Sequence, residues 1–231
     1  VAPDHVDLVG AIGDLKDFTG SMWGPVDRHG HGTWCCGFIG ARANEFGVRG
    51  LAYECQVYSG KVLGDSGSGT DETIRKGLEW AIDIDADIVS MSLGGPAMGD
   101  ALHELIVAFA SRPRKFIFAA AGNDGRRNSV NYPAKWKDTL SVGAVDKFGN
   151  VAKFSSRGAE LDIMGPGVEM TSTVPGNRYA AMSGTSMATP CVAAVGGLAL
   201  EKHRSSGGQT DLENTPQMRE HLRRYAIDKG V

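Results

Sequence analysis

Residues 56–93 read QVYSGKVLGDSGSGTDETIRKGLEWAIDIDADIVSMSL, and this stretch predicts a strand, a helix and a second strand. Its first eight residues form a β-rich run that ends in a Gly/Ser loop. The segment 70–84 has helical spacing, with Thr70 or Asp71 as the N-cap. The segment 86–93 is short and apolar, as expected of a buried strand. Four apolar residues share one face of the helix: Ile74, Leu78, Ala81 and Ile82.

The same alternation continues along the chain, and it predicts the fold class. Strands that are apolar throughout and alternate with helices are typical of a parallel sheet covered by helices on both faces. We therefore predict an α/β fold with three layers and a doubly wound, mostly parallel sheet, in one domain of residues 1–231. The last helix is expected to begin with Thr215 as its cap and Pro216 as its first residue. The further elements are helices at 100–111 and 215–227 and strands at 115–122 and 139–145.

The composition of the chain excludes several classes of partner. Of its 231 residues 42% are hydrophobic and 22% are charged, with a net charge of −3. This balance is ordinary for a globular protein, and nothing in it attracts nucleic acid or anionic lipid. No apolar run reaches membrane-spanning length, and the first residues lack the features of a signal peptide. We therefore expect no nucleic-acid and no membrane partner.

The four cysteines do not have the spacing of metal ligands. Cys35 and Cys36 are adjacent, an arrangement that rarely forms a disulfide between the two. We interpret all four as small hydrophobic side chains of the core. One disulfide between distant parts of the chain remains an alternative. The two cysteines besides Cys35 and Cys36 are Cys55 and Cys191.

Polar or glycine-rich loops follow the expected strands at 64–69, 92–96 and 122–128, and another precedes Ser186. Binding sites of open α/β sheets lie outside the carboxyl ends of the strands. The sequence therefore predicts that the functional residues are on these loops.

Ser186 lies in the segment SGTSMATPCVAAVGG, residues 183–197, at the start of an apolar helix. A helix N-terminus presents unpaired N–H groups and a positive dipole end, which suit a nucleophile whose attack creates an oxyanion. The alternative is a hydroxyl residue that only caps the helix. The G-x-S-x-G pattern of a nucleophile elbow is not met, because Ala188 occupies the last position.

His31 is the strongest candidate for a catalytic base. It lies in DRHGHGTWCCGFIGA, residues 27–41, a glycine-rich turn that leads into an apolar helix. A histidine exposed on one side and supported on the other suits a proton shuttle, although an ordinary turn histidine is the alternative. His103, His203 and His221 are expected on solvent-facing sides of helices.

The segments HGHGT and SGTSMATP resemble the histidine and serine blocks of the subtilisin-like serine proteases. Further segments resemble the same family in unbroken order: KVLGDSGSGTDETIRKGLEWAIDIDADIVSMSLGGP, AAAGNDG, NYPAKW, LSVGAVD, FSSRGAELDIMGPG and STVPGNRYAAMSGTSMATP. The resemblance implies a subtilisin-like peptidase domain and a serine endopeptidase that works through an acyl-enzyme. It makes Ser186 the nucleophile, His31 the general base and Asn123 the side-chain donor to the oxyanion, with Thr185 as a weak second donor.

The resemblance also implies how polypeptide substrates bind. An extended peptide would lie between two backbone segments, so side-chain specificity should be broad. A propeptide or peptide inhibitor could occupy the same site. Asn131 falls at the expected floor of the P1 pocket and Asp124 at its rim. The expected backbone segments are Gly67, Ser68 and Gly69 on one side and Ser92, Leu93 and Gly94 on the other, and the P1 walls add Ala120 and Gly122.

The third catalytic residue of the family, an aspartate, is not found where the resemblance requires it. Counting back from the segment HVDL places that aspartate upstream of Val1. Asp17 comes too late, and Asp27 belongs to the histidine block. We therefore expect a fragment whose first core strand and closing C-terminal strand are missing. An inert protease-fold module for binding or structure is the alternative function.

The resemblance further implies a structural Ca²⁺ site. Its side-chain ligands would be Asp7 and Asn44, with carbonyl oxygens of Arg42, Phe46 and Val48. Oxygen ligands from a tight loop suit this ion, and an empty turn is the alternative. Family resemblance also predicts a secreted or extracytoplasmic protein.

Overall fold

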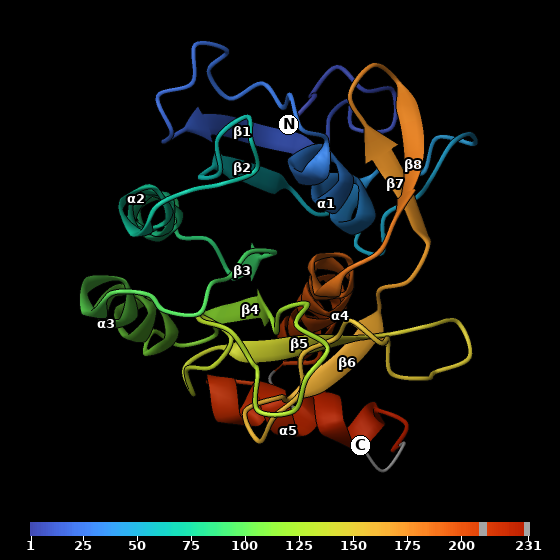
Figure 1. Cartoon of the computed structure of the whole chain (residues 1–231). Helices are drawn as coiled ribbons and strands as arrows, with labels where there is room; N and C mark the ends of the chain where they lie inside the picture. Colours follow the sequence, from blue (N-terminus) through green and yellow to red (C-terminus); the bar gives the residue numbers. More distant parts are fainter. Residues whose placement is uncertain (208–211, 229–231) are drawn as a thin grey trace. The chain divides into compact units, whose positions relative to one another are not determined.

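The structure is a computed structural model that describes residues 1–207 and 212–228. The chain divides into two compact units. The first comprises Val1–Asp85 and Met170–Ala181, and the second comprises Ala86–Glu169 and Met182–Val231. Both contain helices and parallel strands, so the predicted α/β class is confirmed (Figure 1). The prediction of one domain stays a prediction.

The first unit contains two small sheets and two helices. Strand β1 (Ile12–Asp17) pairs in parallel with β2 (Val57–Lys61). The hydrophobic core of this unit is small and includes Leu8, Ala11 and Cys36. The other elements are helices α1 (His31–Gly40) and α2 (Asp71–Asp83) and the two-stranded sheet of β7 (Met170–Val174) and β8 (Arg178–Met182).

The second unit is built on a four-stranded sheet in the order β3-β4-β5-β6, and all its neighbouring strands are parallel. Helix α4 contacts all four strands, and its apolar residues join those of the sheet in one core (Figure 1). The strands are β3 (Ile88–Met91), β4 (Phe116–Ala120), β5 (Leu140–Val145) and β6 (Ile163–Pro166), and the helices are α3 (Asp100–Ala110), α4 (Thr185–Ser205) and α5 (Thr215–Tyr225).

Every helix and strand expected from the sequence is present, with ends that differ by a few residues. Thr70 caps α2 as expected, in a capping box with Thr73. Two details were wrong. The N-cap of α5 is Asn214, whose side chain accepts from the N–H of Gln217, and not Thr215. His203 is buried rather than solvated, at 5% exposure, because its helix packs into the core on that side.

Four strands were not expected from the sequence: β1, β6, β7 and β8. β1, β6 and β8 consist mostly of exposed or half-exposed residues, and β7 is polar although three of its five residues are buried. Within the described residues β2 has β1 as its strand neighbour and β3 has β4. The expected absence of a first core strand and of a closing strand stays a prediction.

The four cysteines are reduced in the structure, and two of them, Cys36 and Cys191, are buried. Burial raises the pKa of the Cys36 thiol to about 11, and it raises the pKa of Cys191 to about 11 as well. These two side chains are therefore neutral thiols at physiological pH. The interpretation of these two as core residues is confirmed.

Helix α1 packs closely on β7, and this contact fixes the helix that begins with His31. The hydroxyls of Ser172 and Thr173 donate to the carbonyl oxygens of Trp34 and Thr33, at 2.8 and 2.9 Å. A Cβ on Gly37 would overlap the Thr173 hydroxyl and lie 2.8 Å from that of Ser172. Only glycine therefore fits at this point of the contact.

We predict that Gly37→Ala destabilises the chain by about 1–3 kcal/mol, because the added methyl group forces the helix away from β7. The measurement is urea unfolding followed by circular dichroism. Gly32→Ala, in the same helix, is the control. Its Cβ would meet only ordinary contacts, the nearest at 3.7 Å, so no loss of stability is expected. Equal stability of the two variants would contradict the packing argument.

Candidate active site

The predicted catalytic residues lie in both units: His31 in the first, and Ser186 and Asn123 in the second. Ser186 is the second residue of α4, so it lies at the positive end of a helix of 21 residues. Its Oγ donates to the carbonyl oxygen of Ser92 at 3.2 Å. The Ser92 hydroxyl in turn donates to the carbonyl oxygen of Ser186 at 2.8 Å. Ser186 thus does not act as the helix cap, because Gly184 occupies that position.

Asn123 follows strand β4 and lies against the start of α4. Its Oδ1 accepts from the backbone N–H of Thr185 at 2.9 Å and from the Thr185 hydroxyl at 3.1 Å. These two bonds fix the orientation of the amide, and Nδ2, its donor group, is on the side away from Thr185. Nδ2 lies 3.6 Å from the position of a Cβ on Gly184, the helix cap. The predicted oxyanion donor therefore lies beside the helix N-terminus.

Thr185 has a different task from the one expected. Its hydroxyl donates to Asn123 and accepts from the N–H of Gly122 at 3.2 Å. The residue is fully buried. A hydroxyl held in this way orients the Asn123 amide, so we correct its expected role as a second donor to the oxyanion.

The structure brings the residues expected around the P1 pocket together within the second unit. A Cβ on Gly94 would lie 3.6 Å from Asn131 and 3.7 Å from the carbonyl oxygen of Ala120. The Asn131 backbone N–H donates to Ala121, and its side-chain amide donates to Asp124 at 3.2 Å. Gly122 is also in contact, since a Cβ there would overlap the Asn131 amide. Asn131 and Asp124 therefore lie beside Gly94 and Gly122, and their place in a P1 pocket stays a prediction.

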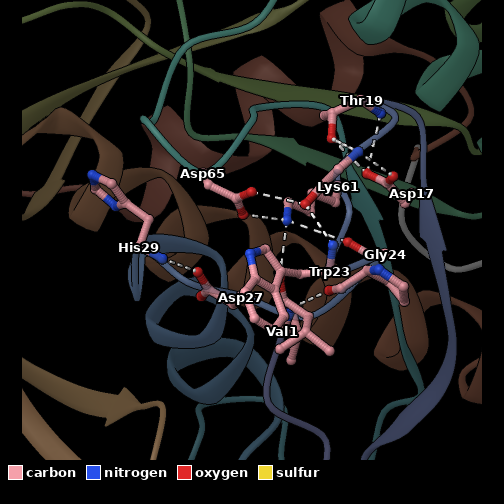
Figure 2. A network of polar contacts seen from close by, with 12 residues as sticks. Val1, Asp17, Thr19, Trp23, Gly24, Asp27, His29, Lys61 and Asp65 are labelled. Atoms are coloured by element: carbon pink, nitrogen blue, oxygen red, sulfur yellow. Dashed lines mark hydrogen bonds and ion pairs between the residues drawn. The ribbon is translucent and has the colours of Figure 1, made fainter.

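On the histidine side, Asp27 holds the turn that precedes α1. One carboxylate oxygen accepts from the N–H groups of His29 and Gly30, at 2.9 and 2.7 Å. The other accepts from the N–H and the hydroxyl of Thr33, at 2.8 and 2.7 Å. Figure 2 shows the bond to His29. The turn is made possible by Gly30, whose φ of 98° lies in the left-handed region that favours glycine. Asp27 thereby accepts hydrogen bonds from the start of the helix that begins with His31, whose N-cap is Gly30.

A buried lysine connects this turn to β2. Lys61 Nζ donates to the carbonyl oxygens of Gly24 and Val26, at 3.3 and 2.9 Å, and to the carboxylate of Asp65 at 2.7 Å (Figure 2). Its side chain is only 9% exposed. Lys61 therefore anchors the segment before His31 to the strand that leads into residues 64–69.

His31 has a pKa below its ordinary value. Burial is the main cause, and the neighbouring imidazole of His29 lowers the pKa further, with the two ring centroids 6.3 Å apart. The negative charge of Asp27 acts in the opposite direction. Burial would raise the pKa of Asp27 itself, but hydrogen bonds from Gly30 and Thr33 outweigh this effect and hold it below the ordinary value. At neutral pH the chain therefore presents a neutral imidazole beside a charged carboxylate.

The loop predicted to bind substrate adjoins this histidine turn. Gly67, with a φ of 82°, packs against His29, whose Nε2 would lie 3.0 Å from a Cβ at that position. Ser68 and Gly69 are exposed, and the carbonyl oxygen of Ser68 accepts from the N–H of Gly64. This segment is thus an exposed backbone next to His29, two residues before the candidate base.

The residues expected to bind calcium also lie together, within the first unit. The Asp7 carboxylate is fully buried and accepts from the Asn44 side-chain amide at 3.0 Å and from the N–H of Val48 at 2.9 Å. The N–H of Arg42 donates to the carbonyl oxygen of Asp7, and the side chain of Phe46 is exposed. The Asn44 Oδ1 atom is buried and has no hydrogen-bond partner within the described part of the chain. In the described residues no three His, Cys, Asp or Glu side chains are grouped for a metal.

Comparison with known proteins identifies the family. The model of the Subtilase family matches residues 1–230. The chain belongs to the subtilase family. Among its relatives, Subtilisin DY from Bacillus licheniformis is 43% identical over 207 residues, which cover 88% of this chain and 74% of that protein.

Two other relatives show the same range of similarity. Subtilisin E from Bacillus subtilis (strain 168) is 47% identical over 180 residues, 77% of this chain and 47% of that protein. Subtilisin Savinase from Lederbergia lenta is 41% identical over 204 residues, 88% of this chain and 72% of that protein. This subtilase chain therefore spans about half the length of some relatives. None of its described helices has the length and apolar character needed to cross a membrane.

Sequence reasoning missed the structural roles of three residues of this subtilase chain. It assigned Ser92 a role through its backbone and not through its hydroxyl. It excluded Asp27 as the third catalytic residue and gave it no further role, although an aspartate shortly before a helix is a known capping signal. It did not use Lys61, and no local pattern marks a lysine that will bind carbonyl groups of a distant turn.

We predict that Asp27→Asn lowers the pKa of His31 further, because a negative charge is removed while the burial of His31 remains. Other charged and titratable groups at or near this turn are Arg28, His29, Lys61 with its partner Asp65, and the Val1 ammonium group. Asp27 raises the pKa of the Val1 ammonium group and Lys61 lowers it. The measurement is an NMR titration of the histidine rings, with His31 assigned by His31→Gln.

Asp17→Asn is the matched control for this titration. Asp17 holds a turn of the same unit by accepting from the N–H and hydroxyl of Thr19 and the N–H of Ser21. Its substitution should leave the His31 pKa unchanged, because Asp17 makes no hydrogen bond to the histidine turn. An unchanged or higher pKa in folded Asp27→Asn would contradict the electrostatic role.

Proposed function

We propose that this chain is a serine endopeptidase that hydrolyses peptide bonds through an acyl-enzyme. Membership of the subtilase family supports this proposal. The observation that carries it is local: Ser186 and the Asn123 amide lie together at the N-terminus of α4. A nucleophile and an oxyanion donor at a positive helix end are the parts that acyl transfer needs.

The proposed reaction has two stages. Ser186 Oγ attacks the carbonyl carbon of the substrate while the neutral His31 imidazole takes the hydroxyl proton. Asn123 Nδ2 donates to the oxyanion that forms. His31 then gives its proton to the amine, the C–N bond breaks, and an ester with Ser186 remains. Water attacks this ester, again with His31 as base, and releases the carboxylic acid and the serine hydroxyl.

The proposed substrates are polypeptides of varied sequence. Backbone recognition by Gly67–Gly69 and by Ser92–Gly94 does not depend on side chains, which supports broad specificity. The polar Asn131 and Asp124 near the P1 position would admit polar or basic groups besides apolar ones. We also propose an extracytoplasmic location, as family resemblance suggests.

We predict that a fluorophosphonate probe labels Ser186, and that the labelling rate falls as the pH falls through the pKa of His31. Protonated imidazole cannot accept the serine proton, which is the physical reason. Mass spectrometry of the labelled peptide locates the probe, and Ser186→Ala is the control that must not react. Hydrolysis of a chromogenic peptide should follow the same pH dependence.

The same labelling and hydrolysis assays, applied to three versions of the chain, distinguish an enzyme from an inert module. The chain is compared with one that is extended upstream of Val1 by the family's Asp-Ser-Gly or Asp-Thr-Gly, and with one in which this Asp is Asn. High activity only with the Asp would support the expected position of the third catalytic residue. Absence of labelling in all three would refute the endopeptidase and leave a binding or structural role.

We further propose that Asp7 and Asn44, with carbonyl oxygens of Arg42, Phe46 and Val48, hold a structural calcium ion. The fit is good in two respects. Asp7 is a buried carboxylate whose partners Asn44 and Val48 are neutral donors, and Asn44 Oδ1 is a buried acceptor without a partner in the described structure. An oxygen ligand set with one carboxylate suits a weakly held Ca²⁺ ion.

Calcium is therefore expected to raise the melting temperature relative to EDTA. At a concentration one hundred times the Kd the stabilisation would be about 2.7 kcal/mol. Asp7→Asn should abolish this calcium effect, while Asp4→Asn, at an exposed position nearby, should retain it. Identical melting of the unsubstituted chain in calcium and in EDTA would contradict the site.

A further inference from the structure

Pro190 lies inside α4, four residues after Ser186. In an α-helix each N–H donates to the carbonyl oxygen four residues earlier. Proline has no N–H, so residue 190 cannot donate to the carbonyl oxygen of Ser186. The candidate nucleophile therefore begins a helix with its own carbonyl group deprived of the helical hydrogen bond.

Ser92, which follows β3 directly, provides a donor at this point. Its hydroxyl donates to the carbonyl oxygen of Ser186 at 2.8 Å. The Ser186 hydroxyl donates to the carbonyl oxygen of Ser92 at 3.2 Å. The two serines are 94 residues apart in sequence and exchange hydrogen bonds in both directions. All three residues belong to the second unit.

We propose that Ser92 is a positioning residue whose hydroxyl gives the Ser186 carbonyl the hydrogen bond that Pro190 cannot give. This bond ties the nucleophile's peptide group to the carboxyl end of β3. It thereby fixes the direction of the Ser186 backbone at the helix start, from which both its side chain and its N–H project. The role of Ser186 as nucleophile rests on the proposed function, whereas the bond itself does not.

The strand offers a matched control in Ser90. This residue is the third of β3, two positions before Ser92, so alternation places the two near each other on one side of the chain. The Ser90 hydroxyl is buried but has no hydrogen-bond partner in the described structure. Ser90→Ala therefore removes a hydroxyl from the same segment without removing a bond.

The test compares Ser92→Ala, Pro190→Ala and the double variant with the unsubstituted chain. Two quantities are measured: the second-order rate at which a fluorophosphonate labels Ser186, and the melting temperature. Ser92→Ala should lose roughly tenfold in labelling rate, the order expected for one hydrogen bond of this kind. In the double variant the Pro190→Ala substitution supplies an N–H for the Ser186 carbonyl, so most of the lost rate and melting temperature should return.

Two further variants distinguish loss of the hydrogen bond from a general loss of folding. Ser92→Thr keeps the hydroxyl and should label at a rate near that of the unsubstituted chain. Ser90→Ala should leave the labelling rate unchanged and should not lower the melting temperature. If Ser92→Ala alone does not fold, recovery of folding in the double variant supports the same bond, and failure of both overturns it.

Additive effects of Ser92→Ala and Pro190→Ala on the melting temperature would overturn the proposal, because they would show that the hydroxyl and the missing N–H do not share an acceptor. Labelling of the Ser92→Ala variant at the same rate as the unsubstituted chain would also overturn the proposal. If the unsubstituted chain is not labelled at all, the proposed function fails. The melting temperatures of the four proteins then decide the positioning bond independently.

Discussion

The packing of α4 along the four-stranded sheet decides where Ser186, the candidate nucleophile, lies. The helix contacts every strand of that sheet, and glycines allow it to approach closely. A Cβ on Gly196 would lie 2.6 Å from the ring of Phe118, and a Cβ on Gly165 would lie 2.8 Å from Val192. Because the helix is held on its long apolar side, its N-terminus is brought to the carboxyl ends of the strands. There Ser186 exchanges hydrogen bonds with Ser92, and Thr185 donates to Asn123.

Polar contacts then do what apolar packing cannot, which is to orient individual groups. The Asn123 Oδ1 atom accepts from the N–H and the hydroxyl of Thr185. These bonds orient the amide, and its nitrogen is the group that could donate to a ligand. On the histidine side a charged Asp27 accepts four hydrogen bonds from one turn. Each arrangement uses a short polar side chain against backbone N–H groups at the start of a helix, where such groups lack helical partners.

Much of this could be predicted because it depends on local sequence. The helix α2, with its helical apolar spacing, and the strands β4 and β5, with their continuous apolar runs, were predicted to within a few residues of their ends. Strands such as β1 and β8 were missed because half-exposed residues give them no clear alternation. His203 was misplaced because a helix of mixed pattern does not show which polar residue faces the core, and the structure buries this one.

The sequence by itself determined the fold class, the two segments that resemble the histidine and serine blocks of the family, and the position of Ser186 at the start of a helix. These follow from periodicity, from capping chemistry and from motifs that are continuous in the chain. Only the tertiary structure decided which groups hold those residues. The bonds of Ser92 to Ser186 and of Lys61 to Gly24 join residues 94 and 37 positions apart. Such pairings depend on how strands and helices pack, and no local pattern encodes a hydrogen bond between distant segments.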